Sequence, residues 1–219
     1  MCLLKTIICL LSLLGLPYVA WGITIEVPTE GTLEKVIDDS DEPSFQTLKI
    51  VGKLNAADIA YLRTGTGRLG GIQTLDLSEV TLVSGDEAYA TIKVEVDDGL
   101  MSNATATFYI SDENRVEQSK TSNALGGYNY TYIYYGNLLA GAFANMAVKQ
   151  VVLPKAQKEI GDYTFYKCEN LTAVIGDAPF ESIGGHAFEG CTSLQDMDLS
   201  QVTTMSTAAF AGCRAFRGR

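Results

Sequence analysis

The chain has 219 residues, of which 47% are hydrophobic and 19% charged, so its composition is that of a folded protein and not of a disordered one. Twenty-six acidic residues against 16 basic ones give a formal net charge of −10 at pH 7. An acidic surface of this kind repels nucleic acid and anionic lipid, so neither is expected as a partner. The chain has a single histidine, the residue that most often acts as an acid or base near neutral pH, which narrows the catalytic chemistry available to it.

The first 22 residues have the layout of a secretory signal peptide. Lys5 is their one charge, residues 7–16 are mostly apolar, and Ala20 and Gly22 are small residues at the −3 and −1 positions of a cleavage site. The apolar run is shorter than the roughly 20 residues that span a bilayer, although a retained anchor is the alternative. Cys9 does not fit a lipidation site, because the apolar run mostly follows it. We therefore predict a secreted or cell-surface protein, with a net charge of −11 once the signal is removed.

Phenylalanine recurs at a nearly constant interval in the second half of the chain. Phe143, Phe165, Phe188 and Phe210 are separated by 22, 23 and 22 residues, and each lies in a related block of the form A-F-x-G-C. Asn145 stands in the glycine position of its block, where a left-handed residue suits the end of a helical turn, and Lys167 is the exception there. A generic amphipathic pattern does not produce such regularity, so the spacing indicates an internal repeat.

A second pattern keeps step with the first. Segments of the form L-x-x-L-x-L begin at Val148, Leu171 and Leu194, as expected for short parallel strands that stack in successive turns. Residues 72–80 match residues 194–202 almost position by position. The apolar positions of 45–50 repeat the same spacing 27 residues before those of 72–77. Between these two segments, Asn55 is placed to cap a short helix.

A segment between the two sets of repeats has strand-like alternation. Residues 92–96, 105–110 and 128–135 read as strands, whereas 111–127 is polar and rich in turn residues. Tyr128, Tyr130, Tyr132 and Tyr134 alternate along the last run, which puts four phenol rings on one face. Tyrosine suits recognition, because a large ring carries one polar tip. The same stripe would also arise from packing of the insertion on the repeats.

These patterns predict an α/β repeat solenoid, a leucine-rich-repeat stack of short parallel strands and short helical turns that carries an antiparallel β insertion. The predicted parts are the signal peptide (1–22), an N-terminal cap with the first turns (23–83), the insertion (84–137) and the regular repeats (138–219). The last repeat begins a strand and stops within it, so we expect a truncated solenoid.

The repeat unit resembles the BspA-like, or treponemal-type, leucine-rich repeat. The resemblance is clearest in residues 160–171 and 183–194, with A-F-x-G-C-x-x-L preceded by I-G; it covers 138–219 firmly and 45–83 loosely. Members of that family are typically secreted or cell-surface bacterial proteins, and some bind host proteins or other cells. The resemblance therefore implies an adhesion or recognition role. It transfers no binding residues, because the family motif belongs to the scaffold.

Cysteines occupy one equivalent position in three repeats. Cys168, Cys191 and Cys213 would lie near one another in adjacent turns, where export would permit a disulfide. The alternative is a buried ladder of free thiols. Their spacing lacks the C-x-x-C arrangement of a zinc site.

Other candidate sites are weak. His186 has no second histidine with which to share a metal and is expected in a solvent-facing turn. The acidic run 38–42 lacks the spacing of a calcium loop and is expected to be a solvated loop. No nucleophile-elbow, H-E-x-x-H or phosphate-loop motif is present. We therefore expect no catalytic residues, cofactor or metal.

The sequence thus predicts a non-enzymatic module that binds a protein on a host or neighbouring cell. The alternatives are a glycan-binding or carbohydrate-active accessory protein that uses the insertion, and a structural spacer.

Overall fold

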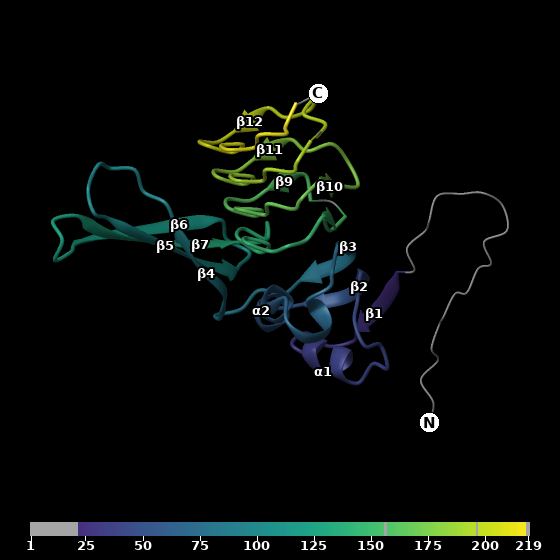
Figure 1. Ribbon diagram of the computed structural model, residues 1–219. Coiled ribbons are helices and arrows are strands. Elements are labelled where there is room, and N and C mark those ends of the chain that lie inside the picture. The colour runs from purple at the N-terminus through teal and green to yellow at the C-terminus, as the bar shows by residue number, and fades with distance from the viewer. Residues whose placement is uncertain (1–21, 156, 196, 218–219) are drawn as a thin grey trace.

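The computed structural model describes residues 22–155, 157–195 and 197–217. The predicted signal peptide, Gly22 apart, lies outside these residues. The chain rises from an N-terminal cap through stacked turns to its C-terminal end, and a separate β-sheet projects from one side (Figure 1). This architecture confirms the predicted leucine-rich-repeat solenoid, although three details differ from the prediction.

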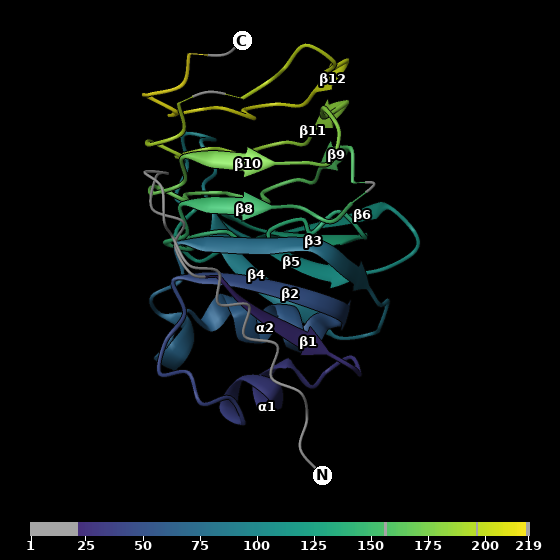
Figure 2. The same cartoon turned by 90° about the vertical axis from the view of Figure 1, so that its right-hand side faces the viewer.

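One wall of the solenoid is a parallel sheet with the strand order β1-β2-β3-β8-β10 (Figure 2). Its strands are β1 (Ile23–Val27), β2 (Thr47–Leu54), β3 (Thr74–Leu82), β8 (Gln150–Val152) and β10 (Ala173–Ile175). In the register of these strands, Leu48 pairs with Leu75, and Leu75 pairs with Val151. The 27-residue offset that the sequence predicted is therefore the strand register. The third predicted copy, which begins at Leu194, is buried there but forms no strand in the part of it that is described.

The N-terminal cap is built around a buried carboxylate. Helix α1 (Leu33–Asp38), helix α2 (Ala56–Thr64) and a 3-10 turn (Gly67–Leu69) cover the first strands. Asp58 is 2% exposed and accepts hydrogen bonds from the backbone N–H groups of Gly31, Leu33 and Asn55. The Asn55 side chain accepts in turn from the N–H groups of Ala57 and Asp58, which confirms the predicted cap and completes a capping box. Asp58 thus fixes the start of α2 to the start of α1.

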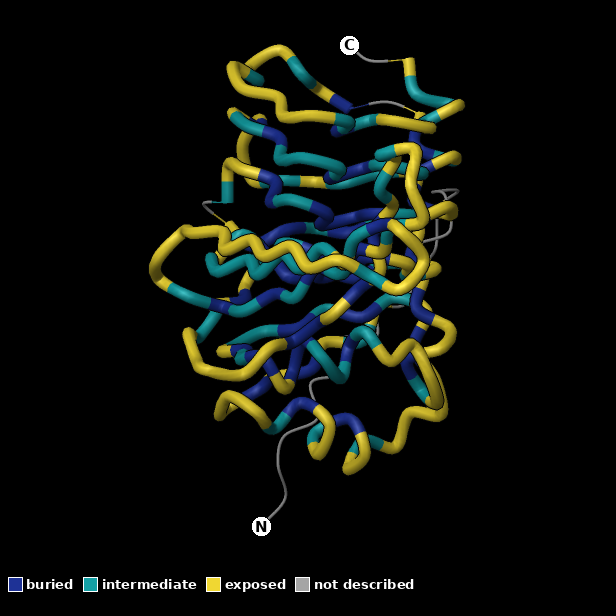
Figure 3. Tube along the Cα trace, turned by 90° about the vertical axis from the view of Figure 1, so that its left-hand side faces the viewer, coloured by how far each residue is buried: buried dark blue, intermediate teal, exposed yellow. Residues whose placement is uncertain are grey.

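The opposite side of the solenoid, which we call the turn wall, consists of the segments 141–145, 163–167, 186–190 and 208–212. The rings of Phe143, Phe165, Phe188 and Phe210 stack inside it with centroids 5.1, 5.3 and 5.0 Å apart. The first three rings are at most 2% exposed. Figure 3 shows the buried residues as a column that runs through the turns. Each ring shields its neighbours from water, which is the reason for the constant spacing.

The turn wall is made of consecutive hydrogen-bonded turns, not of the short helical turns predicted. Within the first segment, Ala142, Ala144 and Met146 donate to carbonyls three residues earlier. Left-handed residues at both ends of each segment interrupt any helix. These are Gly141, Asn145, Tyr163, Lys167, His186, Gly190, Ala208 and Gly212, so Lys167 is no exception.

Backbone hydrogen bonds also join each segment to the next. Gly141, Phe143 and Asn145 donate to the carbonyls of Asp162, Thr164 and Tyr166, and the later segments repeat this pattern. In a helix these N–H groups would form hydrogen bonds within the helix, whereas in the turns they bond to the neighbouring repeat. A further short parallel sheet, of order β12-β11-β9, lies at the corner before the turn wall. Its strands are β9 (Glu159–Ile160), β11 (Ser182–Ile183) and β12 (Thr204–Met205).

The projecting sheet has the order β4-β5-β7-β6 and lies within the predicted insertion. Its strands are β4 (Ala88–Val94), β5 (Asn103–Ile110), β6 (Arg115–Ser122) and β7 (Tyr128–Gly136). The prediction of an antiparallel insertion is wrong for its central pair, because β5 and β7 run parallel. All residues of β6 are exposed, so this polar strand takes the edge, and the half-buried β7 enters between β5 and β6.

Candidate functional site

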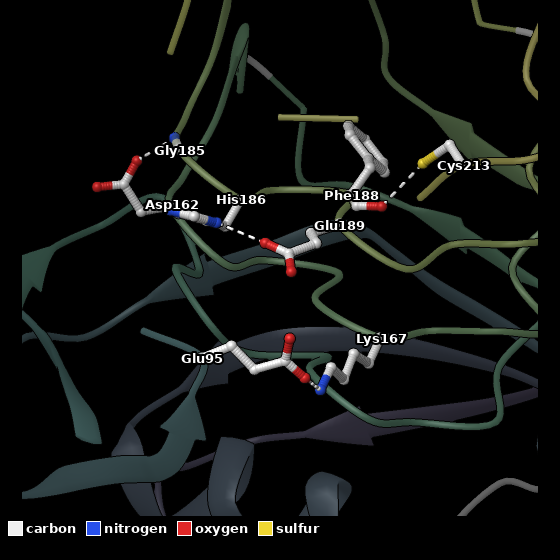
Figure 4. A network of polar contacts seen from close by, with 8 residues as sticks. All are labelled: Glu95, Asp162, Lys167, Gly185, His186, Phe188, Glu189 and Cys213. Atoms are coloured by element: carbon white, nitrogen blue, oxygen red, sulfur yellow. Dashed lines mark hydrogen bonds and ion pairs between the residues drawn. The ribbon is translucent and has the colours of Figure 1, made fainter. Parts of the chain in front are cut away.

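The root of the projecting sheet packs against the turn wall through aromatic rings. Phe108 of β5 lies over Gly141, where a Cβ atom would come within 2.4 Å of the ring, so only glycine admits this contact. Tyr134 of β7 meets Tyr163 edge-on with centroids 5.9 Å apart. Burial raises the pKa of both phenols. An ion pair between Glu95 and Lys167 adds a polar contact farther along the same junction (Figure 4).

The predicted tyrosine stripe lies on the inner face of this sheet. Tyr130, Tyr132 and Tyr134 pair in register with Ala104, Ala106 and Phe108, which are buried, and they pack against the core as half-buried side chains. The structure therefore brings the four tyrosines together on one face, as the alternation predicted, and shows packing contacts for three of them.

Tyr128 lies at the outer end of the stripe, where Lys120 crosses it. The ammonium group is 3.6 Å from the Tyr128 ring centroid and 5.0 Å from that of Tyr130. The hydroxyl of Tyr130 donates to the carboxylate of Asp98 at 3.3 Å. Two cation–π contacts and one acidic partner thus give this end of the sheet a fixed arrangement of charged and aromatic groups.

Sequence reasoning missed the apolar tip of the projecting sheet. Leu100 and Met101, between β4 and β5, are 50% and 67% exposed, and Leu125, between β6 and β7, is 68% exposed. The two loops meet, because the Asn123 side chain donates to the carbonyl of Met101 at 2.6 Å. The available signal is the position of these apolar residues within otherwise polar turn sequences.

The cysteines of the repeats are free thiols, as in the ladder alternative. Each thiol donates to the carbonyl of the phenylalanine one turn earlier, with Sγ–O distances of 2.8, 3.0 and 2.9 Å for Cys168, Cys191 and Cys213. Cysteine is suited to this position because it fills a small apolar site and still offers a weak donor.

His186 is held within the turn wall and is half-buried. Its Nδ1 lies 2.5 Å from a carboxylate oxygen of Glu189, and its ring stacks on Tyr163 with centroids 4.8 Å apart. On the turn below, Asp162 accepts a hydrogen bond from the N–H of Gly185, and burial raises the pKa of the Asp162 carboxyl (Figure 4). The prediction of a turn residue is therefore confirmed, although His186 is less open to solvent than expected. These contacts orient one repeat against the next.

Comparison with protein families shows what the repeats resemble. Residues 137–217 match the BspA type leucine rich repeat region, in six copies. This stretch is therefore similar to BspA-type leucine-rich repeats. No curated protein matches the chain. The BspA-type match begins where the projecting sheet ends, so the N-terminal cap and the projecting sheet lie outside it.

The side chains that recur in the repeats are engaged in contacts between turns. The phenylalanine rings stack inside the solenoid, and the thiols donate to carbonyls of the previous turn. In the residues that the structure describes, no group of three His, Cys, Asp or Glu side chains is placed to hold a metal ion. The described helices include none with the length and apolar character needed to cross a membrane.

Proposed function

We propose that the chain is a recognition module, secreted or displayed on the cell surface, that binds a partner protein through the tip of its projecting sheet. The observation that carries this proposal is the exposed apolar cluster of Leu100, Met101 and Leu125 at the end of the sheet farthest from the repeats (Figure 1). Large apolar side chains gathered at an exposed site are typical of protein interaction surfaces.

The tip is ordered before any partner binds. The Asn123 side chain donates to Met101 and accepts hydrogen bonds from the N–H groups of Leu125 and Gly127. The N–H of Tyr128 donates to the Ser102 hydroxyl at 2.9 Å. Because these contacts fix both loops, a partner would meet a preformed surface and lose less conformational entropy on binding.

The surroundings of the tip have the anatomy of a protein interface. Tyr128 and Lys120 lie behind the apolar cluster, and Asp98 supplies the opposite charge. An apolar centre with an aromatic and charged rim resembles the core and rim of known interfaces. Within the tyrosine stripe, we propose Tyr128 as the ring that contacts a partner, while Tyr130, Tyr132 and Tyr134 support the sheet. This role requires no catalytic residue, and the repeats serve it as a rigid scaffold.

A binding screen of the chain without residues 1–22 against host matrix proteins, cell-surface proteins and glycans tests the proposal. Against the protein ligand found, Met101→Ser and Leu125→Ser should each weaken binding about tenfold or more, because central apolar contacts dominate interface energies. Met205→Ser is the matched control, since Met205 is 49% exposed on a distant repeat strand and its substitution should leave binding unchanged.

Two results would contradict this function. Binding of a glycan with no protein ligand would favour the glycan-binding alternative. Equal losses of binding in the tip variants and in Met205→Ser would show that the tip is not the contact surface.

A further inference from the structure

The strands of the main sheet differ in length, and this difference leaves part of β3 without a neighbour. β3 pairs with β2 up to Leu82, with a bulge between Asp76 and Glu79, but its pairing with β8 ends at Asp76. The last backbone contact on the β8 side is the hydrogen bond from Lys155 N–H to the Ser78 carbonyl at 3.1 Å. Figure 2 shows β3 extending well beyond the end of β8. The chain departs there because Pro154 and the following turn lead it toward β9.

The backbone groups of β3 that face this gap follow from the register. Val83 donates to the Leu54 carbonyl, so after the bulge the odd-numbered residues of β3 bond to β2. Neighbouring residues of a parallel strand direct their N–H and C=O groups to opposite edges. Val80 and Leu82 therefore direct theirs away from β2, on the side from which Lys155 reaches Ser78. No strand in the described part of the chain pairs with them there.

A hollow of about 500 Å³ lies along this edge. Val80, Thr81 and Leu82 form one side of it, and the root of the projecting sheet and the loop after β8 form the others. Ile110, Leu138 and Pro154 provide apolar lining. An open strand edge beside a partly apolar hollow has the geometry that proteins use to add an extended peptide as an extra strand.

We propose that this hollow binds an extended peptide segment of a partner protein, which pairs with Val80 and Leu82 as an added strand. The hollow carries charges of both signs, because Asp112, Glu159 and Glu181 line it together with Lys155 and Lys158. Lys158 and Glu181 form an ion pair at 2.6 Å. The segment is therefore selected by its extended backbone and by apolar side chains that meet the apolar lining, and not by net charge. This site is separate from the tip of the projecting sheet and does not depend on the function proposed for the tip.

Selection of a displayed library of random short peptides on the chain provides the probe. A selected peptide should lose binding when its backbone is N-methylated at every second residue and keep it when the intervening residues are methylated, because only alternate N–H groups of an added strand pair with β3. Amide hydrogen exchange at Val80 and Leu82 should slow when the peptide binds. A peptide insensitive to methylation, or one that leaves both amides unchanged, would overturn the proposal.

Asn137→Trp tests the location without altering the core, because Asn137 is an exposed residue that lines the hollow. The indole should fill the hollow and weaken peptide binding about tenfold or more. Asn170→Trp is the matched control on an exposed turn of the repeats and should bind normally. Met101→Ser should also bind normally, which separates this site from the tip. Unchanged binding by Asn137→Trp would refute the site, as would a library that yields no peptide.

Discussion

The thiols of the repeats show how a single side chain meets two demands, filling a small apolar site and satisfying a backbone carbonyl. Burial raises the pKa of Cys168 to about 12 and shifts that of Cys191 in the same direction. Because a raised pKa favours the neutral thiol and the thiolate is the reactive form, both buried thiols should react slowly at pH 8. We predict that, in the chain without residues 1–22, which carry Cys2 and Cys9, Ellman's reagent at pH 8 labels half-buried Cys213 first and leaves Cys168 and Cys191 unlabelled until the chain unfolds. A disulfide between turns, detected by mass before reduction, would contradict the ladder.

Residue positions that repeat were predictable from the sequence, and singular ones were not. The phenylalanine spacing predicted the stacked rings because every turn presents the same environment to its neighbour. Asn55 was predictable from local capping chemistry. Arg63 carried no such signal, although it is half-buried and donates to the carbonyls of Gly141 and Ala142, nearly 80 residues later in the chain. Arg63 meets these carbonyls only because folding places α2 beside the first segment of the turn wall. A local sequence pattern cannot predict such a long-range contact.

At the scale of elements, the first segment of the turn wall faces a particular problem. Each later segment accepts hydrogen bonds from the N–H groups of the segment before it, but the carbonyls of Ala140 and Ala142 have no such predecessor. Tyr89 of β4 donates its hydroxyl to Ala140, and Arg63 of α2 donates to Ala142. Burial and desolvation raise the pKa of Tyr89 and lower that of Arg63, which is consistent with contacts made away from water. The N-terminal cap and the projecting sheet thus each supply a side-chain donor in place of the missing preceding segment.

This arrangement predicts that Tyr89→Phe lowers the free energy of unfolding by about 0.5–1.5 kcal/mol, because the partly buried Ala140 carbonyl loses the hydrogen bond from the phenol. Urea denaturation followed by circular dichroism measures the change. Tyr135→Phe is the control, since Tyr135 is half-exposed on the outer face of the projecting sheet and stacks on Tyr109 through its ring alone. Equal stability losses in the two variants would refute the capping role of Tyr89.

The elements of the insertion were predicted only in part. The alternation of apolar residues identified β5 and β7, but the sequence of β6 has no buried face and was interpreted as a polar turn region. Its order comes from backbone pairing along β7, from Arg115 to Ser122, and not from burial. The strand order could not be predicted from the sequence either. The parallel pairing of β5 with β7 depends on how the sheet packs against the turn wall, which is a contact between distant parts of the chain.

At the scale of the whole molecule, stability should be distributed along the solenoid as a sum of contacts between neighbouring turns. Phe165 is fully buried between two rings, whereas Phe210 is half-buried, so their truncations should differ in effect. We predict that Phe165→Ala lowers the free energy of unfolding by about 3–5 kcal/mol and that Phe210→Ala lowers it by less. Urea denaturation of the two variants measures this difference.

The location of the residues that lose protection from hydrogen exchange is a second measure of how far each turn depends on its neighbours. In Phe165→Ala, hydrogen exchange should quicken in the described residues from 186 to 217, because the segment 186–190 is hydrogen-bonded to the weakened segment 163–167. The amides of β1 and β2 should keep their protection, because α1 and α2 cover these strands independently of the later turns. Exchange that quickens equally throughout the chain would show a single cooperative unit. In that case the projecting sheet would unfold together with the repeats. Every core variant that lowers the free energy of unfolding would then also reduce partner binding.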